Sequence, residues 1–101
     1  MTMLLLVFRH SLDEEILQLL KEMDVKSFTE APKVLGMGEA GTAFSSMAWP
    51  GSNCMILAAM EDDQATRVVA RLREFRDRLT KHQRNVKIPL RVFALPCERL
   101  L

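Results

Sequence analysis

The stretch V-L-G-M-G-E-A-G-T-A-F-S-S-M-A-W-P-G-S, Val34 to Ser52, connects the second and third predicted strands in chain order. It contains all four glycines, one of the four prolines and the only tryptophan of the chain. Short apolar runs flank it, Lys33 to Leu35 on one side and Cys54 to Leu57 on the other. This composition between two strand-like runs predicts a long loop on a rigid frame, where binding residues are often found.

Four segments before and after this loop have the patterns of strands. Thr2–Arg9 and Asn53–Met60 are apolar on both faces, which is typical of strands in the middle of a sheet. A strand is also expected at Val25–Leu35, where Pro32 has no N–H to donate and therefore indicates an edge or a bulge. The last strand is expected at Leu90–Leu95.

Two segments have apolar residues at helical spacing, Leu12–Met23 and Asp63–His82. Ser11 and Glu14 form the S-x-x-E pattern of a capping box at the start of the first. The resulting order is strand, helix, strand, strand, helix, strand over 1–101. It predicts a single α+β domain, a ferredoxin-like βαββαβ sandwich whose antiparallel four-stranded sheet has both helices on one face.

This architecture leaves one face of the sheet without a helix, although the first and third strands are apolar on both faces. Apolar side chains on an open sheet face indicate that another surface covers them. We therefore expect an oligomer in which the sheets of several subunits pack together.

Charge and hydropathy restrict the function classes. The net charge is only +1, and the central strands lack the aromatic residues of an RNA-binding sheet, so no nucleic-acid partner is expected. Met1 to Phe8 is too short to span a bilayer and has no basic leader. Cys54 and Cys97 stand 43 positions apart without a C-x-x-C motif, which favours free thiols over a disulfide. A cytoplasmic protein that does not insert into a membrane is predicted.

No motif in the sequence indicates catalysis, since no nucleophile is accompanied by a base, and no enzyme is expected. Gly36-Met37-Gly38 either ends a strand or lets backbone amides approach a phosphate closely. The basic residues around the last connection have two interpretations as well. They complement the dipole of the second helix, or they meet a phosphate held by a neighbouring subunit; they are Lys81, Arg84, Lys87 and Arg91.

The order and spacing of several segments resemble the PII nitrogen-regulatory superfamily, in particular the short PII-like signalling proteins with a W-P-G turn. The resemblance covers nearly the whole chain. The segments that carry it are Val7–Val25, Val34–Gly38, Trp49–Gly51, Met60–Ala65 and Arg91–Leu95.

The resemblance implies a homotrimer that binds a small anionic effector between its subunits, with an adenine nucleotide (ADP, AMP or ATP) as the candidate. It implies that Gly36, Met37 and Gly38 contact the nucleotide, and that Lys87 and Arg91 hold its phosphates. The segment 39–52 would then be an arm that regulates a membrane transporter or another partner. Its candidate contact residues are Glu39, Phe44, Met47 and Trp49.

The chain also departs from the pattern of that superfamily. It has no tyrosine that a regulatory enzyme could modify, and its connection 81–89 has no glycine. Glu39 and Ala40 stand where the superfamily has a glutamine that serves Mg-ATP. These departures argue against ATP with 2-oxoglutarate as the effector, and they leave a different effector, or none, open.

An alternative of a different class is a metal-binding or metal-efflux-associated ferredoxin-like protein. The two histidines and two cysteines have no metal-like spacing, so no metal site is assigned from the sequence. The soft ligands available to such a protein are His10, Met37, Met47, Cys54 and Cys97.

Overall fold

The computed structural model describes residues 1–34, 36–38, 41–43, 52–82 and 88–101, and in 36–38 and 41–43 it describes the backbone only. Two helices and six strands lie in these ranges. In chain order the elements are β1 (Thr2–Arg9), the 3₁₀ turn η1 (His10–Leu12), α1 (Asp13–Glu22), β2 (Thr29–Val34), β3 (Gly36–Gly38), β4 (Gly41–Ala43), β5 (Asn53–Met60), α2 (Asp62–His82) and β6 (Leu90–Pro96).

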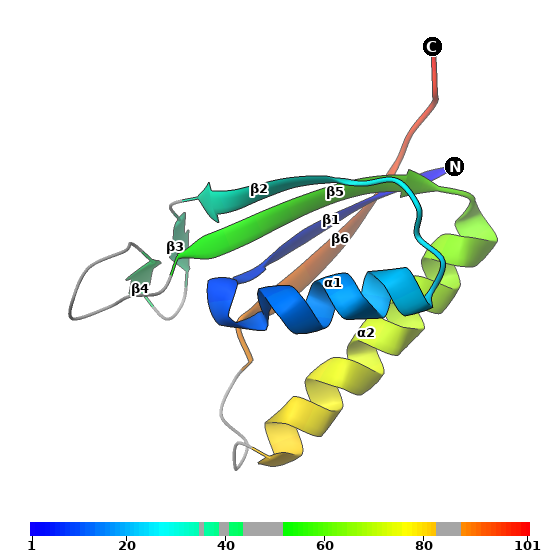
Figure 1. Cartoon of the computed structure of the whole chain (residues 1–101). Helices are drawn as coiled ribbons and strands as arrows, with labels where there is room; N and C mark the ends of the chain where they lie inside the picture. Colours follow the sequence, from blue (N-terminus) through cyan, green and yellow to red (C-terminus); the bar gives the residue numbers. More distant parts are fainter. Residues whose placement is uncertain (35, 39–40, 44–51, 83–87) are drawn as a thin grey trace.

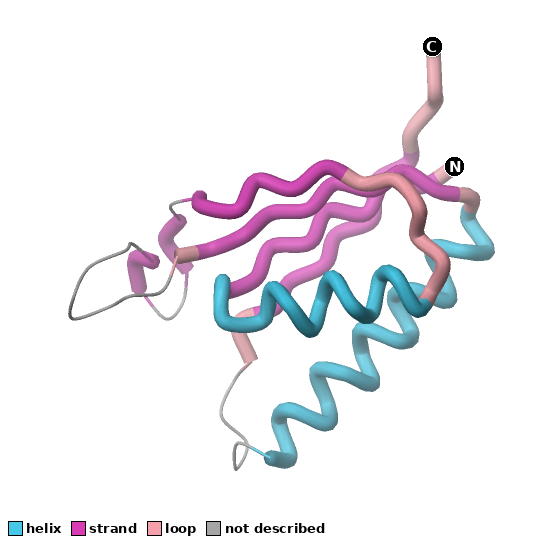
Figure 2. Tube along the Cα trace, in the orientation of Figure 1, coloured by secondary structure: helices cyan, strands magenta, loops and turns pink. Residues whose placement is uncertain are grey.

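The main sheet has the strand order β2-β5-β1-β6, and every neighbouring pair is antiparallel. Both helices lie against the same face of this sheet (Figure 1). The predicted ferredoxin-like α+β sandwich is therefore confirmed. The hairpin of β3 and β4 forms a separate two-stranded sheet beyond the end of β2 (Figure 2).

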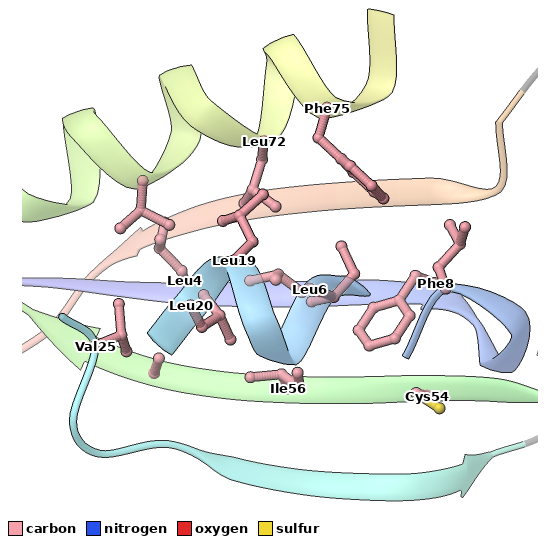
Figure 3. Packing of buried hydrophobic residues seen from close by; sticks show 14 of the residues in the cluster. Leu4, Leu6, Phe8, Leu19, Leu20, Val25, Cys54, Ile56, Leu72 and Phe75 are labelled. Atoms are coloured by element: carbon pink, nitrogen blue, oxygen red, sulfur yellow. The ribbon is translucent and has the colours of Figure 1, made fainter. Parts of the chain in front are cut away.

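The core is formed between the sheet and the helices, because alternate residues of the central strands point to the helical face. Leu4, Leu6 and Phe8 of β1 are at most 1% exposed. Figure 3 shows them between β5 and the helices. The other large, fully buried side chains come from α1, β5 and α2: Ile16, Leu20, Cys54, Ile56, Val68 and Leu72.

The start of α1 differs from the prediction. The chain leaves β1 through η1, so Ser11 lies inside the 3₁₀ turn and Leu12 occupies the cap position without a side-chain cap. The predicted capping box of Ser11 and Glu14 is therefore wrong. The acidic residues of the first turn remain favourable there, because the helix dipole stabilises anions at this end.

The end of α1 is closed by a Schellman motif. The N–H of Asp24 bonds the carbonyl of Lys21 at 3.1 Å, and the N–H of Val25 bonds that of Leu20 at 2.9 Å. Asp24 adopts a left-handed conformation with φ of 60°. Val25 is buried against the core as part of this cap, which explains why the second strand begins at Thr29 rather than at Val25.

Pro32 lies where the β2–β5 register shifts between Ala31 and Val34, on an edge strand, as its missing N–H predicted. β2 ends at Val34, just before Gly36, as the glycines predicted. The expectation that these glycines lie in a loop is wrong, because they form β3 of a second sheet, where Gly36 pairs with Ala43 and Gly38 with Gly41. The ladder between β3 and β4 supplies the backbone hydrogen bonds that the main sheet no longer provides.

Among the described residues, neither helix combines the length and the hydropathy needed to cross a bilayer.

Candidate functional site

The sheet face opposite the helices, called the open face below, is apolar across its three longest strands. In the register of the sheet, Leu5 of β1 lies between Leu57 of β5 and Phe93 of β6. Phe93 and Leu95 are 51% and 46% exposed, although both are large hydrophobic residues. The apolar residues of the open face are Met3, Leu5, Val7, Met55, Leu57, Ala59, Phe93 and Leu95.

Arg91 is the one predicted phosphate ligand that the structure describes. It pairs with Val7 and is exposed, so its side chain emerges on the open face. Lys87 lies outside the described residues, as do Glu39, Phe44, Met47 and Trp49 of the predicted arm.

Within one chain, Arg91 lies far from the Gly36–Gly38 segment. Arg91 is on β6 at one edge of the sheet, while Gly36–Gly38 follows β2 at the other edge. Three strand spacings of about 4.8 Å each, or about 14 Å, separate the two edges. Within one chain, these two candidate ligand-binding elements therefore lie at opposite edges of the main sheet.

A second group of polar side chains lies where β1 ends and α1 begins. His10, Asp13 and Cys54 place one ligand atom each within 4.8 Å of the others. The Sγ of Cys54 lies 3.5 Å from the Nδ1 of His10, and the thiol donates to the carbonyl of Pro32 at 3.2 Å. Cys54 is buried on β5 next to Phe8 of β1 (Figure 3).

Glu30 of β2 lies beside Asp13, next to this group. Burial is the main cause that raises the pKa of Glu30, and the nearby carboxyl of Asp13 raises it further. The Oδ1 of Asp13 and the Oε2 of Glu30 are both buried and receive no hydrogen bond within the described structure. Burial, with the charges of Asp13 and Glu30, also raises the pKa of the Cys54 thiol to about 11. Negative charge is therefore unfavourable at this position, and a shared proton or a cation would reduce its cost.

This group was only partly visible in the sequence. His10 and Cys54 were among the soft ligands named there, but Asp13 and Glu30 were not. Only the pairing of Glu30 with Ile56, two residues from Cys54, brings Glu30 to the same face. Cys97 lies at the other end of β1, where its N–H bonds the carbonyl of Met1, so it does not join His10 and Cys54. Met47 lies outside the described residues, and for Met37 only the backbone is described.

The strand order, the helices on one face and the hairpin after β2 together define the fold of the PII-like signalling proteins. CPII, a nitrogen regulatory PII-like protein from Thiomonas intermedia K12 bound to ADP, AMP and bicarbonate, matches with a TM-score of 0.64 at 17% identity, over 93% of this chain and 90% of that chain. A candidate PII-like signalling protein from Thermus thermophilus matches with a TM-score of 0.61 at 18% identity, over 93% and 85% of the two chains.

A further CPII structure, bound to ADP and bicarbonate, matches with a TM-score of 0.67 at 17% identity, over 97% of this chain and 88% of that chain. No family model and no curated protein matches the sequence. The structural likeness confirms the PII-like fold that the sequence predicted.

Proposed function

We propose that this chain is a PII-like regulatory protein, without catalytic activity, that forms a homotrimer and binds a small anionic effector between its subunits. The effector changes the population of one conformation of the arm 39–52 and thereby the affinity for a partner, with a membrane transporter as the candidate. The observation that carries the proposal is the placement of Arg91 and Gly36–Gly38 at opposite edges of an apolar-faced sheet.

The open face supports the homotrimer. A contiguous apolar surface of this kind is rarely left in water by a monomeric protein. Phe93 and Leu95 project from the edge strand β6, where a neighbouring subunit can reach them, and Leu57 lies on β5 beyond β1. Burial of each such large side chain contributes about 1.5–3 kcal/mol, which favours the packing of sheet against sheet.

The edge positions support a site between subunits. The backbone N–H groups of Gly36 and Gly38 have no side chain beside them to hinder an approaching phosphate. Arg91 would offer its guanidinium from the neighbouring subunit, where two parallel N–H donors match two phosphate oxygens. Lys87 lies shortly before β6 in the sequence and is proposed as the second cation.

The chemistry of the effector follows from these donors. Two cations together with backbone amides select a phosphate-bearing anion over a neutral ligand. CPII, whose fold is similar, is bound to ADP and AMP in its structure. We therefore propose ADP, AMP or ATP as the effector of this chain. Glu39, Phe44, Met47 and Trp49 are the proposed partner contacts of the arm, since aromatic residues and methionine are common at interface hot spots.

Isothermal titration calorimetry with AMP, ADP and ATP, on protein whose mass is determined by light scattering, tests the proposal. We expect one nucleotide to bind per subunit interface of a trimer. Arg91→Ala should weaken binding by about 10-fold or more, because a charge-assisted hydrogen bond contributes about 1.5–3 kcal/mol. Arg67→Ala is the matched control, since Arg67 is exposed near the start of α2, at the opposite end of the sheet. Absence of binding to a trimeric protein would refute the nucleotide as effector.

A further inference from the structure

A mixed group of sulfur, nitrogen and oxygen ligands converges at the end of the sheet from which the arm departs. His10 belongs to η1, Asp13 to the first turn of α1 and Cys54 to β5. These residues are 44 positions apart at most, and only the fold brings them within 4.8 Å of one another. Glu30 of β2 adds a carboxyl group beside that of Asp13.

We propose that this cluster is a binding site for a divalent transition-metal ion, represented by Zn²⁺, whose ligands are His10, Asp13 and Cys54, with the carboxyl group of Glu30 beside that of Asp13. The site is separate from the proposed effector site and goes beyond the proposed function. It requires neither the trimer nor the nucleotide.

The separation of the ligand atoms suits tetrahedral coordination. With Zn–S of about 2.3 Å and Zn–N of about 2.05 Å, a tetrahedral ion holds its sulfur and nitrogen ligands about 3.6 Å apart. The Sγ of Cys54 and the Nδ1 of His10 are 3.5 Å apart in the structure. This pair therefore needs almost no rearrangement, and a carboxylate oxygen of Asp13 lies within 4.8 Å of both atoms.

The unsatisfied oxygens provide an independent reason to place a cation here. The Oδ1 of Asp13 and the Oε2 of Glu30 are shielded from solvent and receive no hydrogen bond in the described structure. Buried carboxylate oxygens without a donor are costly, and a metal ion bound to Asp13 would also offset the charge of Glu30 beside it. The Asp13 carboxylate, the Cys54 thiolate and the His10 imidazole would give the ion an anionic site that prefers a dication.

The surroundings of the four side chains allow an ion to enter and remain. His10 is exposed and provides access from solvent, whereas Cys54 is buried below it. When the ion binds, the Cys54 thiol loses its proton to solvent and its hydrogen bond to the carbonyl of Pro32. The backbone of His10 also donates to the carbonyl of Ser52 at 2.7 Å, so the bound ion would lie next to the last residue of the arm.

The site would connect elements that are distant in sequence. An ion bound to η1, α1 and β5 would link the first helix to β5, with Glu30 of β2 beside it. Because the unfolded chain cannot assemble this group, binding should stabilise the folded state by mass action. The arm would then have a firmer base in the metal-bound protein.

Titration of the EDTA-treated protein with Co²⁺, followed by displacement with Zn²⁺, tests the site. We expect one Co²⁺ per chain, with visible bands of tetrahedral cobalt and a near-ultraviolet sulfur-to-cobalt band. Cys54→Ser should abolish the sulfur band, and Cys97→Ser should leave it unchanged. His10→Ala should weaken Zn²⁺ binding by about 10-fold or more, and because its side chain is exposed the fold should persist.

The Glu30→Gln variant distinguishes a metal site from a pair of carboxyl groups that only share a proton. In a metal site this variant should keep the sulfur band and bind Zn²⁺ more weakly. If Asp13 and Glu30 only share a proton, Zn²⁺ should leave the melting temperature of the wild-type chain unchanged, and that result would overturn the proposal. A sulfur band that persists in Cys54→Ser would overturn it as well.

Discussion

Leu5 of β1 lies directly opposite Phe93 of β6, on the face of the sheet that carries no helix. Its neighbours Leu4 and Leu6 are fully buried on the helical face. One strand therefore has two apolar faces with different roles, one in the core of the subunit and one available for assembly.

A charge on the open face should prevent assembly. We expect Phe93→Glu to convert the proposed trimer into monomers, because 51% of Phe93 is exposed in the single chain and a carboxylate could not be buried between sheets. Sedimentation velocity measures the change. Leu100→Glu is the control, since Leu100 is 82% exposed and follows the end of β6. Equal masses for wild type and Phe93→Glu would contradict the assignment of this face.

Truncation of the core should destabilise each subunit. Leu6 is 0% exposed between β5 and the helices, so Leu6→Ala removes packed methyl groups and leaves a cavity. We expect the free energy of unfolding to fall by about 2–5 kcal/mol in urea titrations. Leu100→Ala should change it by less than about 0.5 kcal/mol, because that side chain is largely in solvent. A change below about 1 kcal/mol for Leu6→Ala would disagree with the packing seen here.

The cap of α1 contains a position where glycine should be preferred. Asp24 has φ of 60°, a conformation that glycine adopts without a steric cost. We expect Asp24→Gly to raise the free energy of unfolding by about 0.5–1 kcal/mol. The ion pair that it removes, Asp24 with Lys26 at 3.9 Å, is exposed and contributes little. Asp24→Ala loses the same ion pair but keeps a Cβ, and any gain in stability from it would argue against this explanation.

The contacts of Asp62 with the amino terminus should make the free energy of unfolding depend on pH. Asp62 Oδ1 accepts a hydrogen bond from Thr2 at 2.6 Å and pairs with the Met1 ammonium at 3.2 Å. The hydrogen bond from Thr2 and the ammonium lower the pKa of Asp62 from 3.8, and Asp62 raises the pKa of the ammonium from 8.0.

The signs of these two shifts define the range of maximum stability. The contribution of Asp62 is present above pH 3.8 and is lost as pH falls through its lower folded pKa. That of the ammonium is present below pH 8.0 and is lost as pH rises through its higher folded pKa. Urea midpoints at about pH 2, 6 and 10 should therefore vary less in Asp62→Asn than in the wild type. An identical pH profile in both would show that the contact has no energetic effect.

The sequence determined the elements that depend on local patterns. The apolar run Asn53–Met60 predicted β5 at its observed bounds, and Pro32 predicted the irregular edge strand β2. The periodicity of α2 located that helix to within one residue at its start. These predictions succeeded because side-chain period and the missing N–H of proline act over a few residues.

Other features were decided by tertiary contacts. Ser11 has the capping pattern, but the direction in which β1 delivers the chain places it in η1 instead. Gly36 and Gly38 have the composition of a loop, yet pairing with β4 makes them a strand. Likewise, His10, Asp13, Glu30 and Cys54 become neighbours only through strand register and helix placement.

The sequence alone thus determined the order of strands and helices and the excess of apolar residues on the central strands, because both follow from local periodicity and composition. Only the tertiary structure decided which residues meet. It separated Arg91 from Gly36–Gly38 across the sheet and brought His10 to Cys54, since distance in a folded chain depends on strand pairing rather than on position in the sequence.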